Sequence, residues 1–185
     1  MLNHLSREEL EAGLDEIRAS PGEAGPLELI VVRPEQGERR TPDSGELCLT
    51  EGLIGDNWRT RGSRHTEDGS AHPGMQLTLM NTHVATLLAQ SPERRALAGD
   101  QLYVDLDISE EHLPAWTELR IGEAIVAVTD TPHTGCKKFV TRFGLEAMKF
   151  VNSERGRKLR LRGVNAKVVQ PGRIAVGDIV RKVVR

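Results

Sequence analysis

The sequence is poor in aromatic residues, with two Trp, one Tyr and three Phe among its 185 residues. Surfaces that stack nucleic-acid bases depend on exposed aromatic rings, so this scarcity argues against nucleic acid as a partner. The core must therefore consist mainly of Val, Leu and Ile. A chain of this length is expected to form one compact domain, or one domain with a short appendage, and can fold without disulfides.

Cysteine is also scarce, since only Cys48 and Cys136 are present and no CxxC motif joins them. This count excludes a disulfide framework and fits a reducing compartment. No apolar run approaches the roughly 20 residues that cross a bilayer, and the N-terminal residues lack the apolar centre of a secretory signal. We therefore expect a cytoplasmic protein with no membrane partner.

Several cofactor motifs are missing as well. No GxGxxG sequence follows a predicted strand, and the chain has no Walker loop. It also contains no recognisable flavin, haem or iron–sulfur motif, so any reductase activity would need electrons from an external donor.

The charge is nearly balanced overall, with 25 basic and 27 acidic residues, but it is unevenly distributed. Residues 137–173 contain eleven basic and two acidic residues, whereas residues 100–118 contain six acidic residues and no basic residue. The basic stretch is either a solvated helical face or a pocket for a small anion such as phosphate. We favour the pocket because clustered Lys and Arg focus an electrostatic field and because the stretch begins beside a cysteine.

Hydrophobic periodicity and turn residues predict a mainly β protein. Ser6 and Glu9 form a capping box for an N-terminal helix that ends at residues 20–22, and a second long helix is predicted over residues 143–161. Strands are predicted at residues 27–32, 46–50, 76–80, 101–106, 118–121, 123–129, 163–169 and 178–184, with a helix after Asn81 and a long polar loop over residues 57–74.

This pattern favours a β-barrel with mixed or antiparallel strands and peripheral α-helices. We divide the chain into residues 1–45, an N-terminal helix and strand packed on the barrel, and residues 46–185, the barrel domain.

Cys136 is the strongest candidate for chemistry. It follows the strand ending near residue 128 and is flanked by His133, Lys137 and Lys138. Cations beside a thiol favour the thiolate, which is the form that attacks electrophiles and binds metals. Cys48 lies between Leu47 and Leu49, and we interpret it as an inert core cysteine.

Two other interpretations of Cys136 remain open. Together with His65, His72 and His133 it could supply four zinc ligands, although their spacing matches no zinc signature. A Cys–His hydrolase is also possible, but no nucleophile-elbow or papain-like context surrounds the cysteine.

Four segments, taken in their order along the chain, resemble the MOSC domain, which is named after the C-terminal part of the molybdenum cofactor sulfurases. They are residues 52–56 (GLIGD), 76–80 (QLTLM), 135–139 (GCKKF) and 172–178 (GRIAVGD). The resemblance covers roughly residues 46–184. It implies a β-rich barrel whose key cysteine, Cys136, carries sulfur or binds the molybdenum of the molybdopterin cofactor.

The resemblance also implies an activity and its partners. Similar proteins reduce N-hydroxylated compounds, although their usual Arg-x-Pro-Cys motif reads His133-Thr134-Gly135-Cys136 here. The expected function is therefore a small molybdenum-dependent oxidoreductase, or a sulfur or cofactor carrier, served by an electron or sulfur donor protein. Pyridoxal phosphate is not expected, because the desulfurase domain that holds it in the sulfurases is absent.

Around Cys136, the residues expected to bind this anionic cofactor are His133, Lys137, Lys138, Arg142, Arg162, Asp56 and His72. Lys and Arg suit the cofactor's phosphate. Asp56 would orient a polar group, and His72 would lie at the rim of the pocket. The alternative function is a non-catalytic module that binds an anion or docks a partner, in which the cysteine is incidental.

Overall fold

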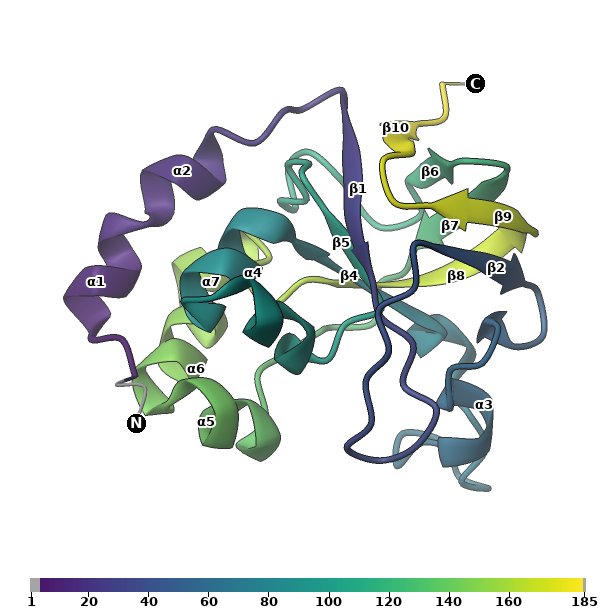
Figure 1. Cartoon of the computed structure of the whole chain (residues 1–185), viewed down its shortest axis with the longest axis horizontal. Helices are drawn as coiled ribbons and strands as arrows, with labels where there is room; N and C mark the ends of the chain where they lie inside the picture. Colours follow the sequence, from purple (N-terminus) through teal and green to yellow (C-terminus); the bar gives the residue numbers. More distant parts are fainter. Residues whose placement is uncertain (1–3, 185) are drawn as a thin grey trace.

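The computed structural model describes residues 4–184, and its centre is a closed barrel of seven strands (Figure 1). Around the barrel the strands follow the order β1 (Ala24–Ile30), β10 (Ile179–Lys182), β6 (Glu118–Ile121), β7 (Ala124–Val128), β8 (Val164–Gln170), β4 (Leu77–Asn81) and β5 (Leu102–Val104). Strand β5 closes the ring on β1. The pair β4–β5 is parallel and the other pairs are antiparallel, which confirms the predicted mixed barrel with peripheral helices.

Strand β1 lies within residues 1–45, so this segment contributes a barrel strand as well as the N-terminal helices. The division at residue 45 stays a prediction.

A small second sheet contains β3 (Gly52–Leu53), β2 (Ser44–Cys48) and β9 (Gly172–Ala175), of which β3 and β9 were not predicted. Cys48, at the end of β2, is only half-buried, and its Sγ lies 3.3 Å from Thr50 Oγ1. This hydrogen bond lowers the pKa of the Cys48 thiol. The interpretation of Cys48 as a core residue is wrong, because the apolar run around it continues into Leu49, which is exposed.

Two apolar clusters fill the protein, one inside the barrel and one between the barrel and the helices. Successive side chains of a strand point to opposite faces, so neighbouring residues enter different clusters. Leu79 and Leu102 face the barrel interior, whereas Met80 and Tyr103 pack under the helices. Strands β4 and β5 are therefore buried on both faces, whereas β6 and β10 alternate buried apolar residues with charged ones.

Most helices cover one side of the barrel, whereas α3 (Trp58–Arg61) lies apart on the polar loop (Figure 1). The covering helices are α1 (Arg7–Ala12), α2 (Leu14–Arg18), α4 (Thr82–Ala89), α5 (Lys137–Phe143), α6 (Leu145–Asn152) and α7 (Glu154–Lys158). Two 3₁₀ helices, η1 (Pro73–Met75) and η2 (Pro92–Ala98), complete the structure. Among residues 4–184 no helix is both long and apolar enough to span a membrane.

The predicted capping box is confirmed, but both predicted long helices are divided. Ser6 N–H donates to Glu9 Oε2 over 2.7 Å, and Gly13 separates α1 from α2. The helix predicted over residues 143–161 is two short helices, α6 and α7, because Ser153 caps the start of α7, and Gly144, with φ = 91°, separates α6 from α5. A positive φ ends a right-handed helix.

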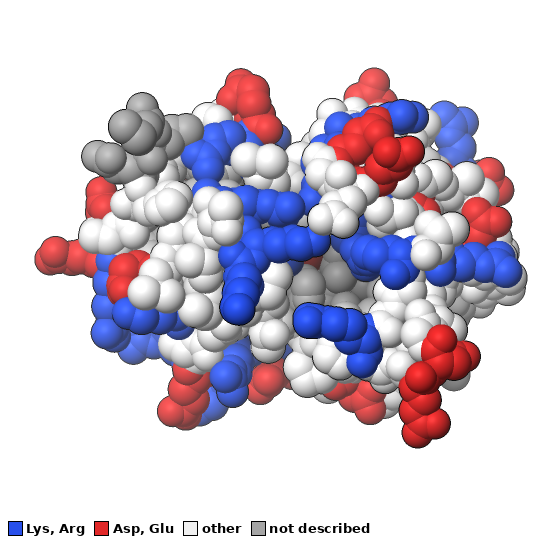
Figure 2. Space-filling model, turned by 90° about the horizontal axis from the view of Figure 1, so that it is seen from below, with Lys and Arg blue, Asp and Glu red and all other residues white. Residues whose placement is uncertain are grey.

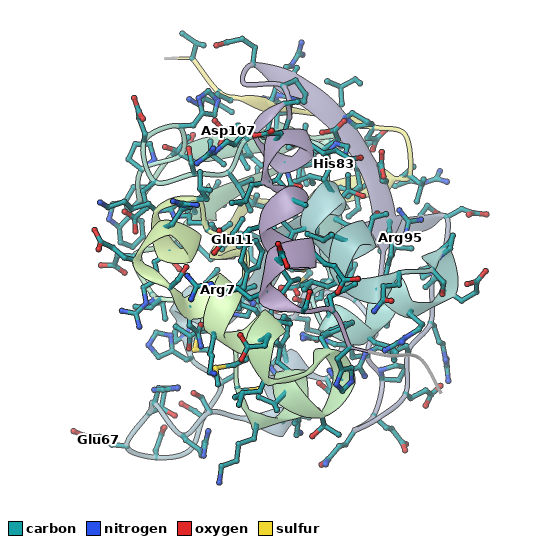
Figure 3. The ribbon with its side chains drawn as sticks, turned by 90° about the vertical axis from the view of Figure 1, so that its left-hand side faces the viewer. Arg7, Glu11, Glu67, His83, Arg95 and Asp107 are labelled. Atoms are coloured by element: carbon teal, nitrogen blue, oxygen red, sulfur yellow. The ribbon has the colours of Figure 1, made fainter. Side chains whose placement is uncertain are left out.

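Figure 3 shows the helical side, with Arg7 and Glu11 on the outermost helix, α1. His83 of α4 connects helix α2 to the barrel. Its Nδ1 lies 3.2 Å from Glu16 Oε1 of α2, and its Nε2 lies 3.1 Å from Oδ1 of Asp105, which follows strand β5. At the opposite extreme, Glu67 lies at the tip of the polar loop and points away from the body of the protein (Figure 3).

Gly163 is the glycine whose replacement tests the barrel geometry most sharply. It has φ = 101°, and a Cβ there would lie 2.3 Å from the carbonyl oxygen of Leu79. We expect Gly163→Ala to lower the free energy of unfolding by at least about 3 kcal/mol, because backbone strain and overpacking add. Gly37→Ala is the matched control: its φ is 94° with nothing within 4 Å of the added Cβ, so strain alone should cost about 1–2 kcal/mol. If urea unfolding showed equal losses of free energy of unfolding for Gly163→Ala and Gly37→Ala, this geometry would be contradicted.

Candidate functional site

Cys136 is exposed and immediately precedes helix α5. Its carbonyl accepts hydrogen bonds from the backbone N–H groups of Phe139 and Val140, which form the first turn of the helix. Lys137 and Lys138 are also exposed, whereas Phe139 is buried and anchors the turn. The thiol is therefore accessible to a ligand, and its metal binding stays a prediction.

Two asparagine side chains hold the segment that leads to Cys136. Asn152 Oδ1 accepts from Gly135 N–H over 2.9 Å, and Asn152 Nδ2 donates to the Gly135 carbonyl over 3.2 Å. Asn165 Nδ2 donates to the carbonyls of Thr131 and Pro132. These hydrogen bonds hold the backbone before Cys136 in place, so the position of Cys136 is fixed while the cysteine side chain itself is not used.

His133 also fixes this segment, through a buried carboxylate. Its Nε2 lies 2.9 Å from Asp100 Oδ1, and Arg162 Nη1 donates to Asp100 Oδ2 over 2.6 Å. Burial would raise the pKa of Asp100, but Arg162 and His133 together hold that pKa well below its usual range. Burial, aided by the Arg162 charge, lowers the pKa of His133, so its ring is neutral at pH 7. The neutral ring then donates its Nε2–H to ionised Asp100.

Three arginines converge on the end of η2. Arg142 Nη1 donates to the Leu97 carbonyl over 2.8 Å, Arg162 Nη2 to Ala98 over 3.1 Å, and Arg33 Nη1 to Gly99 over 2.7 Å. Carbonyls at the end of a helix have no partner within the helix and carry partial negative charge. They therefore bring together three guanidinium groups that would otherwise repel one another.

Asp56 neutralises one of these arginines. The side chain of Asp56 is fully buried. Its carboxylate accepts hydrogen bonds from Arg33 Nε over 2.8 Å and from Arg33 Nη2 over 2.9 Å, which is the bidentate geometry that carboxylate and guanidinium groups favour. Both of its oxygens are thus engaged by Arg33. The structure gives Asp56 a role in holding Arg33 at the site.

Arg39, in the loop between β1 and β2, completes a group of four that we call the arginine cluster: Arg33, Arg39, Arg142 and Arg162. Burial, together with the charges of Arg142 and Arg33, lowers the pKa of Arg39. The Nε atoms of Arg39 and Arg162 are buried without a hydrogen-bond partner. Figure 2 shows Lys and Arg side chains around a hollow on the face where this loop, α3 and α5 lie. The cluster therefore keeps donors available for an anion.

The other predicted site residues are placed differently. His72 caps η1, because its Nδ1 accepts from Gly74 N–H over 3.1 Å, and His65 lies exposed on the polar loop. Within the described part of the chain, no group of three or more His, Cys, Asp or Glu side chains is arranged to hold a metal ion. The four-ligand zinc alternative is therefore wrong, since one of its histidines is used locally and another ring bonds to Asp100.

Sequence reasoning missed Arg33, Arg39, Asp100 and Asn152. Arg33 directly follows the strand predicted over residues 27–32, and Asp100 is the first residue of the acidic stretch. Their partners lie far away in the sequence: Arg33 is 23 positions from Asp56 and 66 from Gly99. No local spacing indicates such contacts.

The MOSC domain family model matches residues 82–181. The chain belongs to the MOSC domain family. That family is associated with binding of the molybdenum cofactor. The matched residues include Asp100, Cys136, Arg142 and Arg162 but neither Arg33 nor Arg39. No protein with curated annotation matches the chain.

Solved structures share this fold at low sequence identity. YiiM from Escherichia coli is 22% identical, with a TM-score of 0.55, covering 88% of this chain and 70% of its own. The YUAD protein from Bacillus subtilis is 12% identical, with a TM-score of 0.59 and coverages of 85% and 94%. YiiM from Geobacillus stearothermophilus is 15% identical, with a TM-score of 0.56 and coverages of 87% and 76%. At these identities the likeness supports the fold alone.

Asp100→Asn tests the buried pair beneath the cysteine segment. The change leaves Arg162 buried without its counter-charge, so we expect a loss of about 3–5 kcal/mol in the free energy of unfolding at pH 7. Because the pKa of Asp100 is lowered in the folded state, its contribution is present above the ordinary value of 3.8 and is lost as the pH falls through the folded value. The difference in the free energy of unfolding between wild type and Asp100→Asn should therefore become smaller in strong acid. A constant difference in denaturant unfolding from pH 7 to pH 2 would contradict this role.

His133→Gln tests the neutral imidazole. Since the pKa of His133 is lowered below 6.5, the unfolded chain takes up a proton more readily as the pH falls through that value. Folding is then disfavoured by up to about 1.4 kcal/mol per pH unit. We expect the free energy of unfolding of His133→Gln to fall less between pH 7 and pH 5 than that of the wild type. His65→Gln, at an exposed loop position, is the control. If the free energy of unfolding of His133→Gln depended on pH as strongly as that of the wild type, the neutral state of His133 would be contradicted.

Proposed function

We propose that this protein binds the molybdenum cofactor, with the Cys136 thiolate as the metal ligand and the arginine cluster as the site of the cofactor's phosphate. One observation supports this most strongly: the exposed cysteine begins the helix whose last turn carries Arg142 into the cluster. A thiolate ligand and an anion-binding group thus lie at the two ends of α5.

The length of α5 sets the distance between these two groups. Arg142 is six positions after Cys136, which corresponds to about 9 Å along a helix axis. Molybdopterin carries its metal-binding sulfurs at one end and its phosphate at the other, so an elongated ligand of this kind can contact both groups. A small inorganic anion can reach only one of them.

The chemistry of the donor groups fits the cofactor. A soft thiolate suits a thiophilic transition metal, and guanidinium groups suit phosphate through paired, charge-assisted hydrogen bonds. The buried, unpartnered Nε of Arg162 is one donor that lacks an acceptor in the protein. Lys137 and Lys138 add positive charge beside the thiol, and Asn152 holds the backbone that presents it.

We further propose that the bound cofactor serves either the reduction of N-hydroxylated compounds or the transfer of sulfur or cofactor. When bound, the cofactor would supply two-electron redox chemistry at its metal. The protein's own part would be to present Cys136, to neutralise the phosphate and to leave the metal side open to a substrate. A separate protein would have to donate the electrons or the sulfur.

Replacement of each cysteine in turn tests this function. The purified chain is reconstituted with molybdopterin cofactor, and bound molybdenum and pterin are measured by mass spectrometry and by fluorescence of the oxidised pterin. We expect wild type and Cys48→Ser to bind about one metal per chain, and Cys136→Ser to lose at least about tenfold in molybdenum content. Cys48 is the matched control because it lies on the small second sheet, outside the site.

Two outcomes would contradict the proposal. Either the wild type binds neither molybdenum nor pterin after reconstitution, or Cys136→Ser retains as much molybdenum as the wild type.

A further inference from the structure

A groove of about 780 Å³ lies between the N-terminal helices α1 and α2 on one side and α6 and α7 on the other. Figure 3 shows this side of the molecule, with Arg7 and Glu11 on the side of α1 that faces these helices. The lining residues of α1 and α2 are Arg7, Glu11, Leu14 and Arg18, which share one helical face and span about 16 Å along a helix axis. The groove is therefore elongated, and its volume is within the range of about 300–1,000 Å³ that is typical of small-molecule sites.

The bottom of this groove is apolar. Leu14, Phe150 and Leu161 line it and belong to the apolar cluster under the helices, and Leu159 packs against that cluster. The charged lining residues form the rim, where most of them are exposed. A ligand that fills the groove must therefore present an apolar body to the bottom and a polar group to the rim.

The rim has more positive charge than its own carboxylates neutralise. Each of its three acidic residues forms an ion pair with a cation of the same rim: Arg7–Glu11, Lys149–Glu146 and Lys158–Glu154. Arg18 and Arg155 also line the groove, and neither has a carboxylate partner among residues 4–184. The polar group that complements this rim is therefore an anion.

These two arginines lie toward the same end of the groove. At the opposite end α1 begins beside α6, because a Cβ on Gly144 would be 2.8 Å from the side chain of His4. From there α1–α2 and α6–α7 extend side by side (Figure 1, Figure 3), with Arg18 as the last residue of α2 and Arg155 on α7. A carboxylate at this end would face guanidinium groups from both walls, and guanidinium favours paired hydrogen bonds to such an anion.

We propose that this groove binds an elongated amphipathic carboxylate, of which a medium-chain fatty acid is the simplest form. The apolar chain would lie along Leu14, Phe150 and Leu159, and the carboxylate would bind Arg18 and Arg155. This site is separate from the proposed function, since neither Cys136 nor the arginine cluster lines the groove. The α1–α2 wall also lies outside the residues that the family model matches, so the family match does not supply this site.

Calorimetric titration with decanoate, below its micelle concentration and at low ionic strength, tests whether the apolar bottom holds a chain. We expect the wild type to bind decanoate and to bind hexanoate at least about tenfold more weakly, because each buried methylene contributes about fourfold in affinity. Leu159→Ser should weaken decanoate binding by about tenfold, for the same reason. Leu145→Ser is the matched control, because Leu145 is exposed on α6 and does not line the groove.

The same titration tests the carboxylate end. We expect Arg18→Ala and Arg155→Ala each to weaken decanoate binding about fivefold or more, because each removes a charge-assisted hydrogen bond. Arg157→Ala is the matched control, since Arg157 is exposed on α7 and does not line the groove. Arg157→Ala, Leu145→Ser and Cys136→Ser should all bind decanoate within about twofold of the wild type.

Failure of this site and failure of cofactor binding are distinguishable, because decanoate binding is measured without molybdenum or pterin and does not need Cys136. The proposal is overturned if the wild type binds no decanoate or if hexanoate binds as tightly as decanoate. It is also overturned if Arg18→Ala or Arg155→Ala binds decanoate as tightly as the wild type, or if Arg157→Ala loses as much affinity as they do.

Discussion

The site depends on three consecutive carbonyl groups at the end of η2, those of Leu97, Ala98 and Gly99, and on the guanidinium groups that they accept. Without these acceptors, arginines from three separate parts of the chain would repel one another in a poorly solvated space. Asp56 and Asp100 then neutralise Arg33 and Arg162. Arg39 and Arg142 have no carboxylate partner among residues 4–184, and we propose that this remaining positive charge attracts the anionic end of the ligand.

The barrel and the helices position the cysteine on the same scaffold. Asp100 directly follows Gly99, so the residue that neutralises Arg162 also holds His133, three positions before Cys136. From the other side, Asn152 of α6 grips the Gly135 peptide. The thiol and the arginine cluster are therefore parts of one hydrogen-bonded unit. A disturbance at Asp100 should reach both.

The sequence was sufficient for the barrel because its apolar strands and turn residues repeat at short range, and the cysteine stood out because its neighbours are polar and basic. The two long predicted helices were wrong in extent, since the first is interrupted at Gly13 and the second at Ser153, and hydrophobic periodicity indicates neither break. The arginine cluster was only half predicted. Arg142 and Arg162 lie in the basic stretch, but Arg33 and Arg39 reach the site through contacts distant in sequence, and the role of Asp100 depends on full burial. Such pairings arise from tertiary structure.

The central claim is that Cys136 and the arginine cluster hold two ends of one ligand. The most direct test is the rate of Cys136 alkylation by iodoacetamide, with and without molybdopterin cofactor, in a Cys48→Ser background so that Cys136 is the single thiol. We expect the cofactor to slow alkylation at least about tenfold, and Arg142→Ala to remove most of that protection at the same cofactor concentration. An alkylation rate that the cofactor leaves unchanged, or protection that persists in full without Arg142, would contradict the claim.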